Sequence, residues 1–379
     1  MKRLRLGMVG GGQGAFIGGV HRTASRIDDQ WSLVAGCLSS SQDRSRASAE
    51  ELGIASERCY ASFYEMALEE AAREDGIDAV AIVTPNHLHA APAIAFLKAG
   101  IHVICDKPLA SKMTDALAIA DAVKDSGKLF ILTHNYTGYP MVRQAKEMVA
   151  ARELGSIRVI QVEYAQDWLT EATENKQATW RTDPNQAGDG GSIADIGTHA
   201  LHLANFVAGI KPNFLAADLS RFVIGRQVED NAHVLLRYEN GARGILWSSQ
   251  VAVGNENSLK LRIYGDIGGI EWSQENPNQM VFTRFGNPKT ILTRAGAGAY
   301  NSGLRISRTP GGHPEGYLEC FATIYSEAAH LIRQAKDGIL PPEGVSVPDV
   351  EAGLDGMRFI NACISSSKSN SAWTPLVAN

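Results

Sequence analysis

The sequence predicts an α/β protein of two domains: an N-terminal doubly wound parallel sheet, then an α+β domain with a large, mostly antiparallel open sheet. Three observations support this. The chain, at 379 residues, is long for one compact core. Strand and helix patterns alternate with short connections through the first 134 residues. Several strand-like runs follow, two of them flanking Asn240-Gly241, a hairpin signal. We therefore place the domains at residues 1–134 and 135–379.

Composition limits the partners. The 36 Lys and Arg against 41 Asp and Glu give a net charge of -5 without a basic run, which argues against a nucleic acid partner. We expect no membrane partner, because no apolar stretch approaches the roughly 18 residues of a span. The five cysteines form no CxxC pair, so we expect reduced thiols and a cytoplasmic protein.

In the first domain, apolar runs bounded by turn residues predict the strands and amphipathic runs predict the helices. Strands are expected at 4–9, 32–38, 79–83, 102–105 and 129–133, and helices at 15–27, 44–52, 88–99 and 114–126. Polar residues follow each expected strand. Because ligands of parallel sheets bind at the carboxyl ends of the strands, we expect these residues to line a crevice.

The first expected strand ends in a glycine-rich loop that leads into a helix. Gly10 and Gly12 fit the first two positions of GxGxxG, the third falls on Ala15, and Gly18 follows three residues later. This spacing indicates a variant with a longer loop. Bare backbone and unpaired amides at a helix N-terminus suit a pyrophosphate, so we expect a dinucleotide here, although ordinary tight turns also hold glycines.

The end of the second expected strand bears on the choice of dinucleotide. NAD sites usually carry an acid there, whereas this chain has Ser39, and Arg44 could meet a 2′-phosphate or be an ordinary solvated residue. NAD is expected, with NADP possible. The predicted cofactor-binding residues are Gly10, Gly12, Gln13, Gly14, Ala15, Phe16, Ile17, Ser39, Ser40, Arg44, Thr84, Pro85, Asn86, His89, Asp106, Lys107 and Asn135.

Asp106-Lys107-Pro108 comes directly after a buried strand. In a partly dry crevice beside a cationic nicotinamide, the pKa of Lys107 would fall, and its amine could orient or deprotonate a substrate hydroxyl. Proline fixes the turn that holds the lysine. The alternative is an ordinary surface lysine in a loop.

The stretch Gly190–Gly209 is the strongest candidate for the chemistry. If Ser192 caps a helix that runs to about Val207, Asp195 and His199 lie at i and i+4 on one face. A surface salt bridge or a buried, satisfied histidine would give the same pattern. A metal held by this pair and His202 is a weaker alternative, because no cysteine or glutamate cluster completes a shell, and we expect no metal.

Four segments, GMVGGGQGAFIGGVHR, TPNHLH, CDKPLA and GGSIADIGTHALHL, together resemble the Gfo/Idh/MocA family of nicotinamide-dependent sugar and inositol oxidoreductases. The resemblance implies a Rossmann domain and assigns catalysis to Lys107, Asp195 and His199. It also implies a homo-oligomer, commonly a tetramer, built on the second domain's sheet. Asp106 stands where the family usually has glutamate, which shortens a supporting arm but keeps its charge.

The remaining segments complete the second domain. Helices are expected at 141–151 and 350–366, and a long helix is expected to follow the 312–317 stretch and to end at about 336. Strands are expected at 157–167, 214–223, 232–238, 242–251, 258–264 and 280–284. Arg181 beside Trp180 suits a polyhydroxylated ring, and the resemblance places a histidine, here His313, toward a sugar. The alternative for each is an ordinary loop residue that contacts no ligand. The predicted substrate-binding residues are Lys107, Tyr136, Arg181, Asp195, His199 and His313.

The function predicted from the sequence is NAD-dependent oxidation of a ring hydroxyl in a cyclic polyol, such as scyllo- or myo-inositol, or of an aldopyranose to its lactone. Two alternatives keep the fold and chemistry: an NADP(H)-dependent keto-sugar reductase, and an enzyme that shuttles hydride between two sugars. A third alternative, of another class, is a sensor that binds dinucleotide without catalysis.

Overall fold

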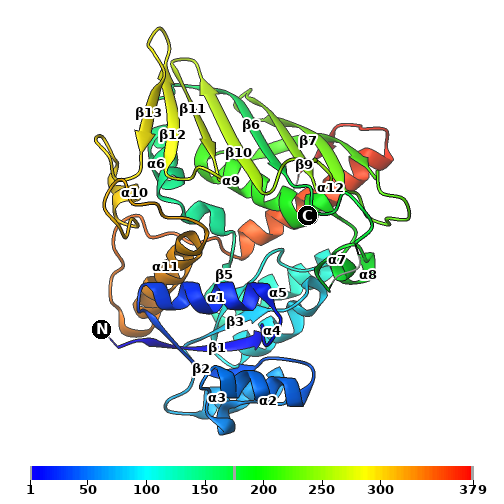
Figure 1. Cartoon of the computed structure of the whole chain (residues 1–379), viewed down its shortest axis with the longest axis vertical. Coiled ribbons are helices and arrows are strands. Elements are labelled where there is room, and N and C mark those ends of the chain that lie inside the picture. The colour runs from blue at the N-terminus through cyan, green and yellow to red at the C-terminus, as the bar shows by residue number, and fades with distance from the viewer. Residues whose placement is uncertain (1, 174–175, 377–379) are drawn as a thin grey trace. The chain divides into compact units, whose positions relative to one another are not determined.

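The computed structural model describes residues 2–173 and 176–376. They form two compact units, which we call unit 1 and unit 2 (Figure 1). Unit 1 comprises Met1–Asn135 and Tyr317–Leu354, and unit 2 comprises Tyr136–Gly316 and Asp355–Asn379. The predicted ranges 1–134 and 135–379 do not include the return of the chain to unit 1.

Unit 1 contains a five-stranded parallel sheet in the order β2-β1-β3-β4-β5. All five residues of β3 are buried, as expected of a central strand covered on both faces. The chain order reverses at β1, which is the topological switch point of such a sheet. The strands are β1 Leu4–Gly10, β2 Trp31–Cys37, β3 Ala79–Val83, β4 His102–Cys105 and β5 Phe130–Leu132.

Helices connect the strands of unit 1, and the predicted alternation is confirmed. One of them, α3, was not expected from the sequence, although Ser62 caps it by accepting a hydrogen bond from the Glu65 amide. The helices are α1 Phe16–Ile27, α2 Gln42–Glu51, α3 Phe63–Ala72, α4 Ala90–Lys98 and α5 Met113–Ser126, with 3-10 turns at Ser56–Arg58, Asn86–Leu88 and Asn135–Gly138.

The helix α11, Tyr317–Asp337, packs against α1 within unit 1. Its Tyr325 hydroxyl lies 2.8 Å from His21 Nδ1, and its Tyr325 carbonyl accepts a hydrogen bond from Trp31 Nε1 at 2.9 Å. The carboxylate of Asp78, just before β3, meets Lys336 Nζ at 2.6 Å. A segment distant in sequence therefore completes the first unit.

Unit 2 contains a nine-stranded sheet in the order β13-β12-β11-β10-β6-β9-β8-β7-β14. β6 and β9 pair in parallel, and the other neighbours pair antiparallel. The predicted mostly antiparallel sheet is confirmed. The strands are β6 Ile157–Ala165, β7 Pro212–Ser220, β8 Asn231–Tyr238, β9 Arg243–Ser249, β10 Ser258–Gly265, β11 Gly268–Ser273, β12 Gln279–Arg284, β13 Thr290–Thr293 and β14 Thr374–Pro375.

Burial alternates along the strands of this sheet. In β8, Val234 and Leu236 are buried whereas Leu235 and Arg237 are exposed, so one face is covered and the other is open. Gly241, with a φ of 87°, allows the turn between β8 and β9, as predicted. The remaining helices are α6 Pro140–Ala150, α7 Lys176–Arg181, α8 Pro184–Ala187, a π-helical turn Ile193–Gly197, α9 Thr198–Ala208, α10 Asn301–Leu304 and α12 Val350–Lys368.

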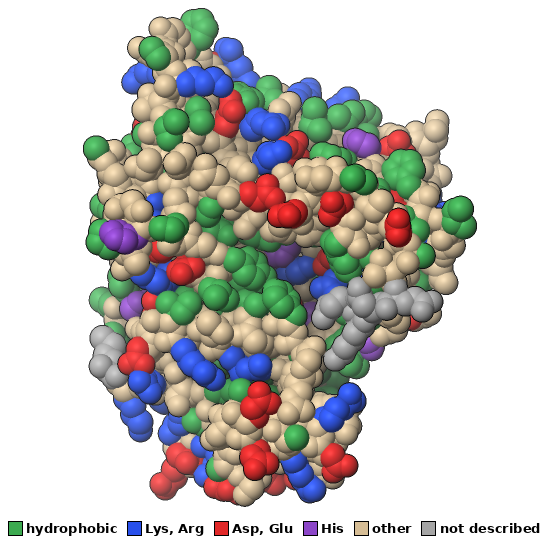
Figure 2. Space-filling view, in the orientation of Figure 1, with side chains coloured by type: hydrophobic (Ala, Val, Ile, Leu, Met, Phe, Trp, Pro, Cys, Tyr) green, Lys and Arg blue, Asp and Glu red, His purple; other side chains and the backbone are tan. Residues whose placement is uncertain are grey.

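The surface charges and the cysteines agree with what the composition predicts. On the face shown in Figure 2, acidic and basic side chains are interspersed. All five cysteines are free thiols. No helix in the described part of the chain is both long enough and apolar enough to cross a membrane.

Candidate active site

In unit 1, the glycine-rich loop between β1 and α1 and the segments that follow β2, β3, β4 and β5 form what we call the loop site. Gly10, Gly11 and Gly14 have positive φ angles of 73–78°, which only glycine adopts readily. A Cβ on Gly18 would lie 2.4 Å from the Cα of Gly11, so the close packing of helix on loop occurs at Gly18. Ala15, at the third position of the sequence motif, is instead the residue preceding the helix.

The loop borders a cavity of about 490 Å³. A Cβ on Gly12 would lie 2.8 Å from the Leu38 carbonyl, so bare backbone is required there. The amides at the start of α1 precede any helical carbonyl that could accept from them, and they suit an anion. These features fit a dinucleotide pyrophosphate. The cavity is lined by Gly12, Gln13, Gly14, Ala15, Phe16, Gly19, Arg22, Ser48, Glu51 and Leu52.

Several loop-site contacts were missed by sequence reasoning. The Gln13 amide donates to Ser48 Oγ at 3.0 Å, and its side chain donates to Glu51 at 3.1 Å. Arg22 donates to the Gly11 carbonyl, and burial lowers the pKa of Arg22. Ser48 lies on α2 and Arg22 lies on α1. The spacing of the apolar residues in these helices does not indicate that their polar side chains contact the loop.

The residues predicted to bind the ribose follow β2. They are polar, and none of them is acidic. Ser39 is half-buried, and its Oγ accepts a hydrogen bond from the Ser41 amide at 3.2 Å. Ser40 is exposed, as is Arg44 on the first turns of α2. This geometry suits the hydroxyls of a ribose or the oxygens of a phosphate.

The segment after β3 is joined to the segment after β4 by His89. Its ring is fully buried, with Nε2 2.9 Å from the Thr84 carbonyl and Nδ1 2.9 Å from the Pro108 carbonyl. Burial lowers the pKa of His89. His89 therefore braces two of the strand ends, and Thr84, Pro85 and the buried Asn86 belong to the segment that it holds.

The carboxylate of Asp106 occupies the end of β4. Thr133 Oγ1 donates to it at 2.9 Å, and His21 Nε2 lies 3.9 Å from its Oδ1. Burial alone would raise the pKa of Asp106, but His21, and then the charges of Lys107 and His89, lower it well below its usual range. The carboxylate is thus ionised beside the half-buried Lys107.

The end of β5 is anchored to α11. The Asn135 side chain is buried and donates to Cys320 Sγ at 3.3 Å. Asn135 comes after β5, so it lies at the same edge of the parallel sheet as the segments that follow the other strands.

In unit 2, the segment that carries Asp195 and His199 differs from the prediction. Ile193–Gly197 is a π-helical turn, α9 continues it, and Ser192 already has helical angles, φ -60° and ψ -36°, without a capping hydrogen bond from its side chain. The predicted Ser192 cap is wrong, because Ser192 Oγ lies 3.3 Å from Ser248 Oγ. Short π-helical turns often occur at functional sites.

Glu229, at the entry to β8, caps this turn instead. Its two carboxylate oxygens accept hydrogen bonds from the Gly191 and Ile193 amides, both at 2.8 Å, and its carbonyl accepts from Ser192 at 3.1 Å. Burial raises the pKa of Glu229 to about 7, although the amide donors oppose this rise. Sequence reasoning missed Glu229, because its partners lie on a distant segment.

Asp195 is held by two side chains from other segments. Arg181 Nε donates to Asp195 Oδ2 at 3.2 Å, and Gln250 Nε2 donates to the same oxygen at 2.9 Å. The guanidinium carbon of Arg181 lies 4.2 Å from the ring centre of Trp180 and 5.9 Å from that of Trp168. Arg181 therefore binds the carboxylate and two aromatic faces, and Gln250 is a further residue that the sequence did not reveal.

The His199 ring is buried against aromatic side chains. It makes an edge contact with Tyr136, with ring centres 4.8 Å apart, and lies 6.3 Å from Tyr164. The two tyrosine hydroxyls bond to each other, and Tyr164 also donates to Asn257 Oδ1 at 2.8 Å. The structure thus brings Tyr136 and His199 together. We call Tyr136, Arg181, Asp195, His199 and Gln250 the helix site.

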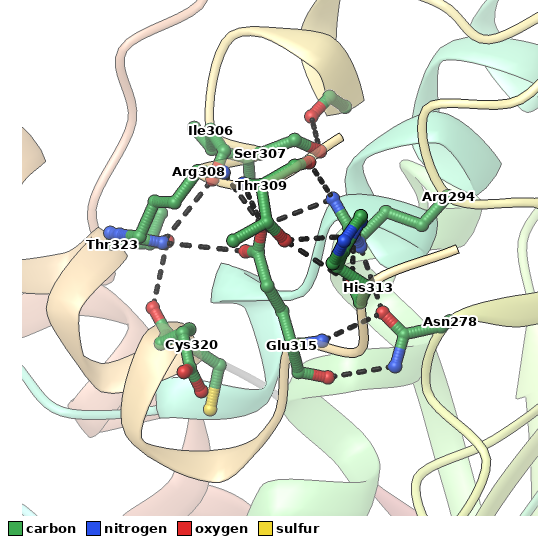
Figure 3. A network of polar contacts seen from close by, with 12 residues as sticks. Asn278, Arg294, Ile306, Ser307, Arg308, Thr309, His313, Glu315, Cys320 and Thr323 are labelled. Carbon is green, nitrogen blue, oxygen red and sulfur yellow. Dashed lines mark hydrogen bonds and ion pairs between the residues drawn. The ribbon is translucent and has the colours of Figure 1, made fainter. Parts of the chain in front are cut away.

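His313 lies in a loop that a buried ion pair anchors (Figure 3). Arg294 Nη1 lies 3.0 Å from Glu315 Oε1, and that oxygen also accepts from the Thr309 amide at 2.8 Å. Arg294 donates to the His313 carbonyl as well, whereas the His313 side chain is exposed. Within unit 2, then, the loop is fixed through the His313 backbone.

The described residues contain no group of three or more His, Cys, Asp and Glu placed to hold a metal ion. His202, the third member of the metal alternative, has a pKa lowered to about 3 by burial and then by the charges of Lys146, Lys211 and Arg143. Those cations would also repel a metal ion from His202.

Comparisons with known proteins cover both units. Residues 4–136 match the oxidoreductase family with an NAD-binding Rossmann fold, and residues 142–271 match the GFO/IDH/MocA C-terminal domain. The uncharacterized oxidoreductase YfiI of Bacillus subtilis (strain 168) is 34% identical over 381 residues, covering 98% of this chain and 96% of its own length.

Two solved structures are similar over nearly the whole chain. The crystal structure of an oxidoreductase from Sinorhizobium meliloti is 53% identical with a TM-score of 0.91, covering 98% of this chain and 99% of its own. An inositol dehydrogenase homolog from Azotobacter vinelandii, complexed with NADH and myo-inositol, is 32% identical with a TM-score of 0.92, covering 99% and 98%.

Proposed function

The chain belongs to the Gfo/Idh/MocA family of NAD(P)-dependent oxidoreductases, and from that premise we propose that it is an NAD-dependent dehydrogenase of a cyclic polyol or an aldopyranose. The substrates we favour are scyllo- or myo-inositol, or a pyranose oxidised at carbon 1 to its lactone. The similar inositol dehydrogenase homolog, which binds NADH and myo-inositol, supports this choice.

The observation that carries the proposal is the helix site. Asp195 and His199 lie one turn apart on a continuous helical segment whose first amides are fixed by Glu229. Asp195 is held in one orientation by Arg181 and Gln250. A carboxylate and an imidazole fixed in this way suit hydrogen bonding to neighbouring hydroxyls and removal of a proton from one of them.

In the proposed reaction, the loop site of unit 1 holds the dinucleotide, which supplies a hydride acceptor at nicotinamide C4. His199 accepts the hydroxyl proton as a general base. Lys107 polarises the same oxygen, and Asp195 orients His199 or binds the adjacent hydroxyl. The carbon loses a hydride as the oxygen loses its proton, leaving a ketone or a lactone. We propose that Lys107, Asp195 and His199 meet at the substrate for this purpose.

The roles of other predicted residues follow from this arrangement. Tyr136, through its contact with His199, borders the substrate, and Arg181 with its indole neighbours covers an apolar ring face. His313 is proposed to reach the substrate from its anchored loop. We also propose a homo-oligomer, with a tetramer favoured, that uses the open face of the unit 2 sheet, and a cytoplasmic location.

One observation supports the alternative cofactor. No acid follows β2 directly, since Ser39, Ser40 and Ser41 occupy that position, and Arg44 is exposed on α2. Rates with NAD and NADP should therefore be compared on a panel of inositols and aldoses, with keto-sugars and NADPH as the reverse arm. Our proposal expects NADH formation from a polyol or an aldose.

The Lys107→Met variant tests the catalytic assignment. Because this change removes an amine from the reacting oxygen and leaves the loop backbone unchanged, turnover should fall at least ~10³-fold with NADH affinity nearly unaltered. The matched control is Lys112→Met, which removes an exposed lysine five positions later. Steady-state rates and NADH fluorescence titration measure the two effects.

Retained turnover in Lys107→Met would refute this mechanism. Tight dinucleotide binding by the unaltered protein, without oxidation of any sugar or polyol on the panel, would favour a sensor. Turnover confined to NADPH and keto-sugars would favour a reductase.

A further inference from the structure

The three amides that lead into and begin the turn carrying Asp195 find their acceptors on one distant residue. Three consecutive amides, those of Gly191, Ser192 and Ile193, all donate to Glu229. Two reach the carboxylate, one on each oxygen, and the third reaches the main-chain carbonyl. Glu229 therefore fixes the backbone immediately before Asp195 in position and in direction.

We call these three hydrogen bonds the Glu229 clamp, and the surrounding geometry makes it specific to these two segments. A Cβ on Gly191 would lie 1.9 Å from the Glu229 carbonyl oxygen, so the two backbones touch only because residue 191 is glycine. Ser192 Oγ bonds to Ser248 rather than to its own turn. Only 6% of Glu229 is exposed, so little water competes for the amides. The carboxylate is also placed where the positive end of a helix stabilises negative charge.

We propose that Glu229 is a positioning residue for the proposed oxidation: its carboxylate sets the π-helical turn that places Asp195, and through α9 it places His199. This inference rests on the proposed function. Displacements of about 1 Å can change catalytic rates by about two orders of magnitude, so loosening this turn should lower kcat more than it alters cofactor affinity.

The neighbouring residue provides a matched control. The carboxylate of Asp230 is also buried and also accepts backbone amides, those of Phe222 and Val223 at 3.0–3.1 Å. It lies 3.6 Å from Arg226 Nη1 as well, and it fixes the loop at 222–226 and not the Asp195 turn. Glu229→Gln and Asp230→Asn each replace one buried carboxylate with an amide of the same shape. Each presents a nitrogen donor where an oxygen accepted a hydrogen bond. A purely structural role for Glu229 would give the two variants the same phenotype.

The first measurement needs no substrate. Hydrogen exchange of the 189–197 peptide should become at least tenfold faster in Glu229→Gln and stay unchanged in Asp230→Asn. Unchanged exchange in Glu229→Gln would show that the Glu229 carboxylate does not hold the turn, and would overturn the proposal. If Glu229→Gln does not fold, Glu229→Asp replaces it, because a side chain one methylene shorter cannot reach both amides and should give the same loss of protection.

The second measurement is made at pH 8.5, with the substrate found on the panel. In Glu229→Gln, kcat should fall at least tenfold, and KM for NAD should stay within threefold of that of the unaltered protein. Asp230→Asn should keep kcat within threefold of the unaltered protein, whether or not its melting temperature changes. Equal kcat values in the two folded variants would overturn the positioning role. Failure of the unaltered protein to oxidise any polyol would count against the proposed function, and hydrogen exchange would still decide whether Glu229 holds the turn.

Discussion

The loop site and the helix site are built in different ways. The loop site is mostly backbone, with glycines that permit close approach and strand ends that follow one another along the chain. The helix site is mostly side chains, in which Arg181, Asp195 and Gln250 come from three separate segments and meet at one carboxylate. Substitutions should therefore affect the first through steric fit and the second through the loss of individual hydrogen bonds.

A Gly18→Ala change should break the loop site. The added Cβ would lie 2.4 Å from Gly11, so helix and loop must separate, at a cost of about 2–3 kcal/mol in the free energy of unfolding and at least tenfold in NADH affinity. Gly19→Ala is the control for stability, because the nearest atom to its Cβ is an Arg22 nitrogen at 3.9 Å. Thermal melting should separate the two, since alanine at 19 favours the helix. Equal melting temperatures would show that the contact at Gly18 is unimportant.

A Gln250→Leu change should weaken the helix site by a smaller amount. It removes one of the donors to Asp195 Oδ2, and hydrogen bonds to charged groups contribute about 1.5–3 kcal/mol, so kcat/KM for the proposed polyol or aldose substrate should fall roughly 10- to 100-fold. NADH affinity should not change. Gln161→Leu in the neighbouring strand β6 is the control, since Gln161 alternates with the buried Ile160 and Val162 and faces the opposite side. A Gln250→Leu enzyme as active as Gln161→Leu would show that the hydrogen bond from Gln250 is not needed to hold Asp195.

The last effect concerns neither site but strand β4 of the parallel sheet in unit 1. His102 Nδ1 accepts the Leu129 amide at 3.0 Å, and burial lowers the pKa of His102 to about 4. Between pH 6.5 and about 4 the unfolded chain binds a proton that the folded chain does not, so stability falls as the pH falls through this window. At pH 5 this costs about 2 kcal/mol.

His102→Gln should therefore lose less stability between pH 8 and pH 5 than the unaltered protein does, because glutamine accepts the same amide without titrating. Urea unfolding at both pH values measures the difference. An identical loss in the two proteins would place the acid sensitivity elsewhere.

The contrast between the sites also explains what could be predicted from the sequence. Contiguous patterns sufficed for the parallel sheet, for the glycine loop and for the strand ends from Thr84 to Asn135, because each depends on local chain geometry. Gly18 could be noted as an extra glycine, but only the structure shows that it packs on Gly11.

Long-range partners account for the errors. Serine is a common N-cap residue, but at Ser192 the amides are satisfied by Glu229, which lies just before the distant strand β8. The single α-helix expected there begins with a π-helical turn. Gln250 and Asn257 gave no local signal, since an amide at a strand terminus is common. The α3 helix does have a local signal, because Ser62 followed three residues later by Glu65 is a pattern typical of a helix start.

The return of α11 to unit 1 has a consequence for synthesis on the ribosome. His21 and Trp31 emerge early, but their partner Tyr325 emerges only after the whole of Tyr136–Gly316 has been translated. The nascent N-terminal sheet must therefore wait, with the surface that α11 will cover still open to water. The unit encoded first is completed only when the chain is nearly finished.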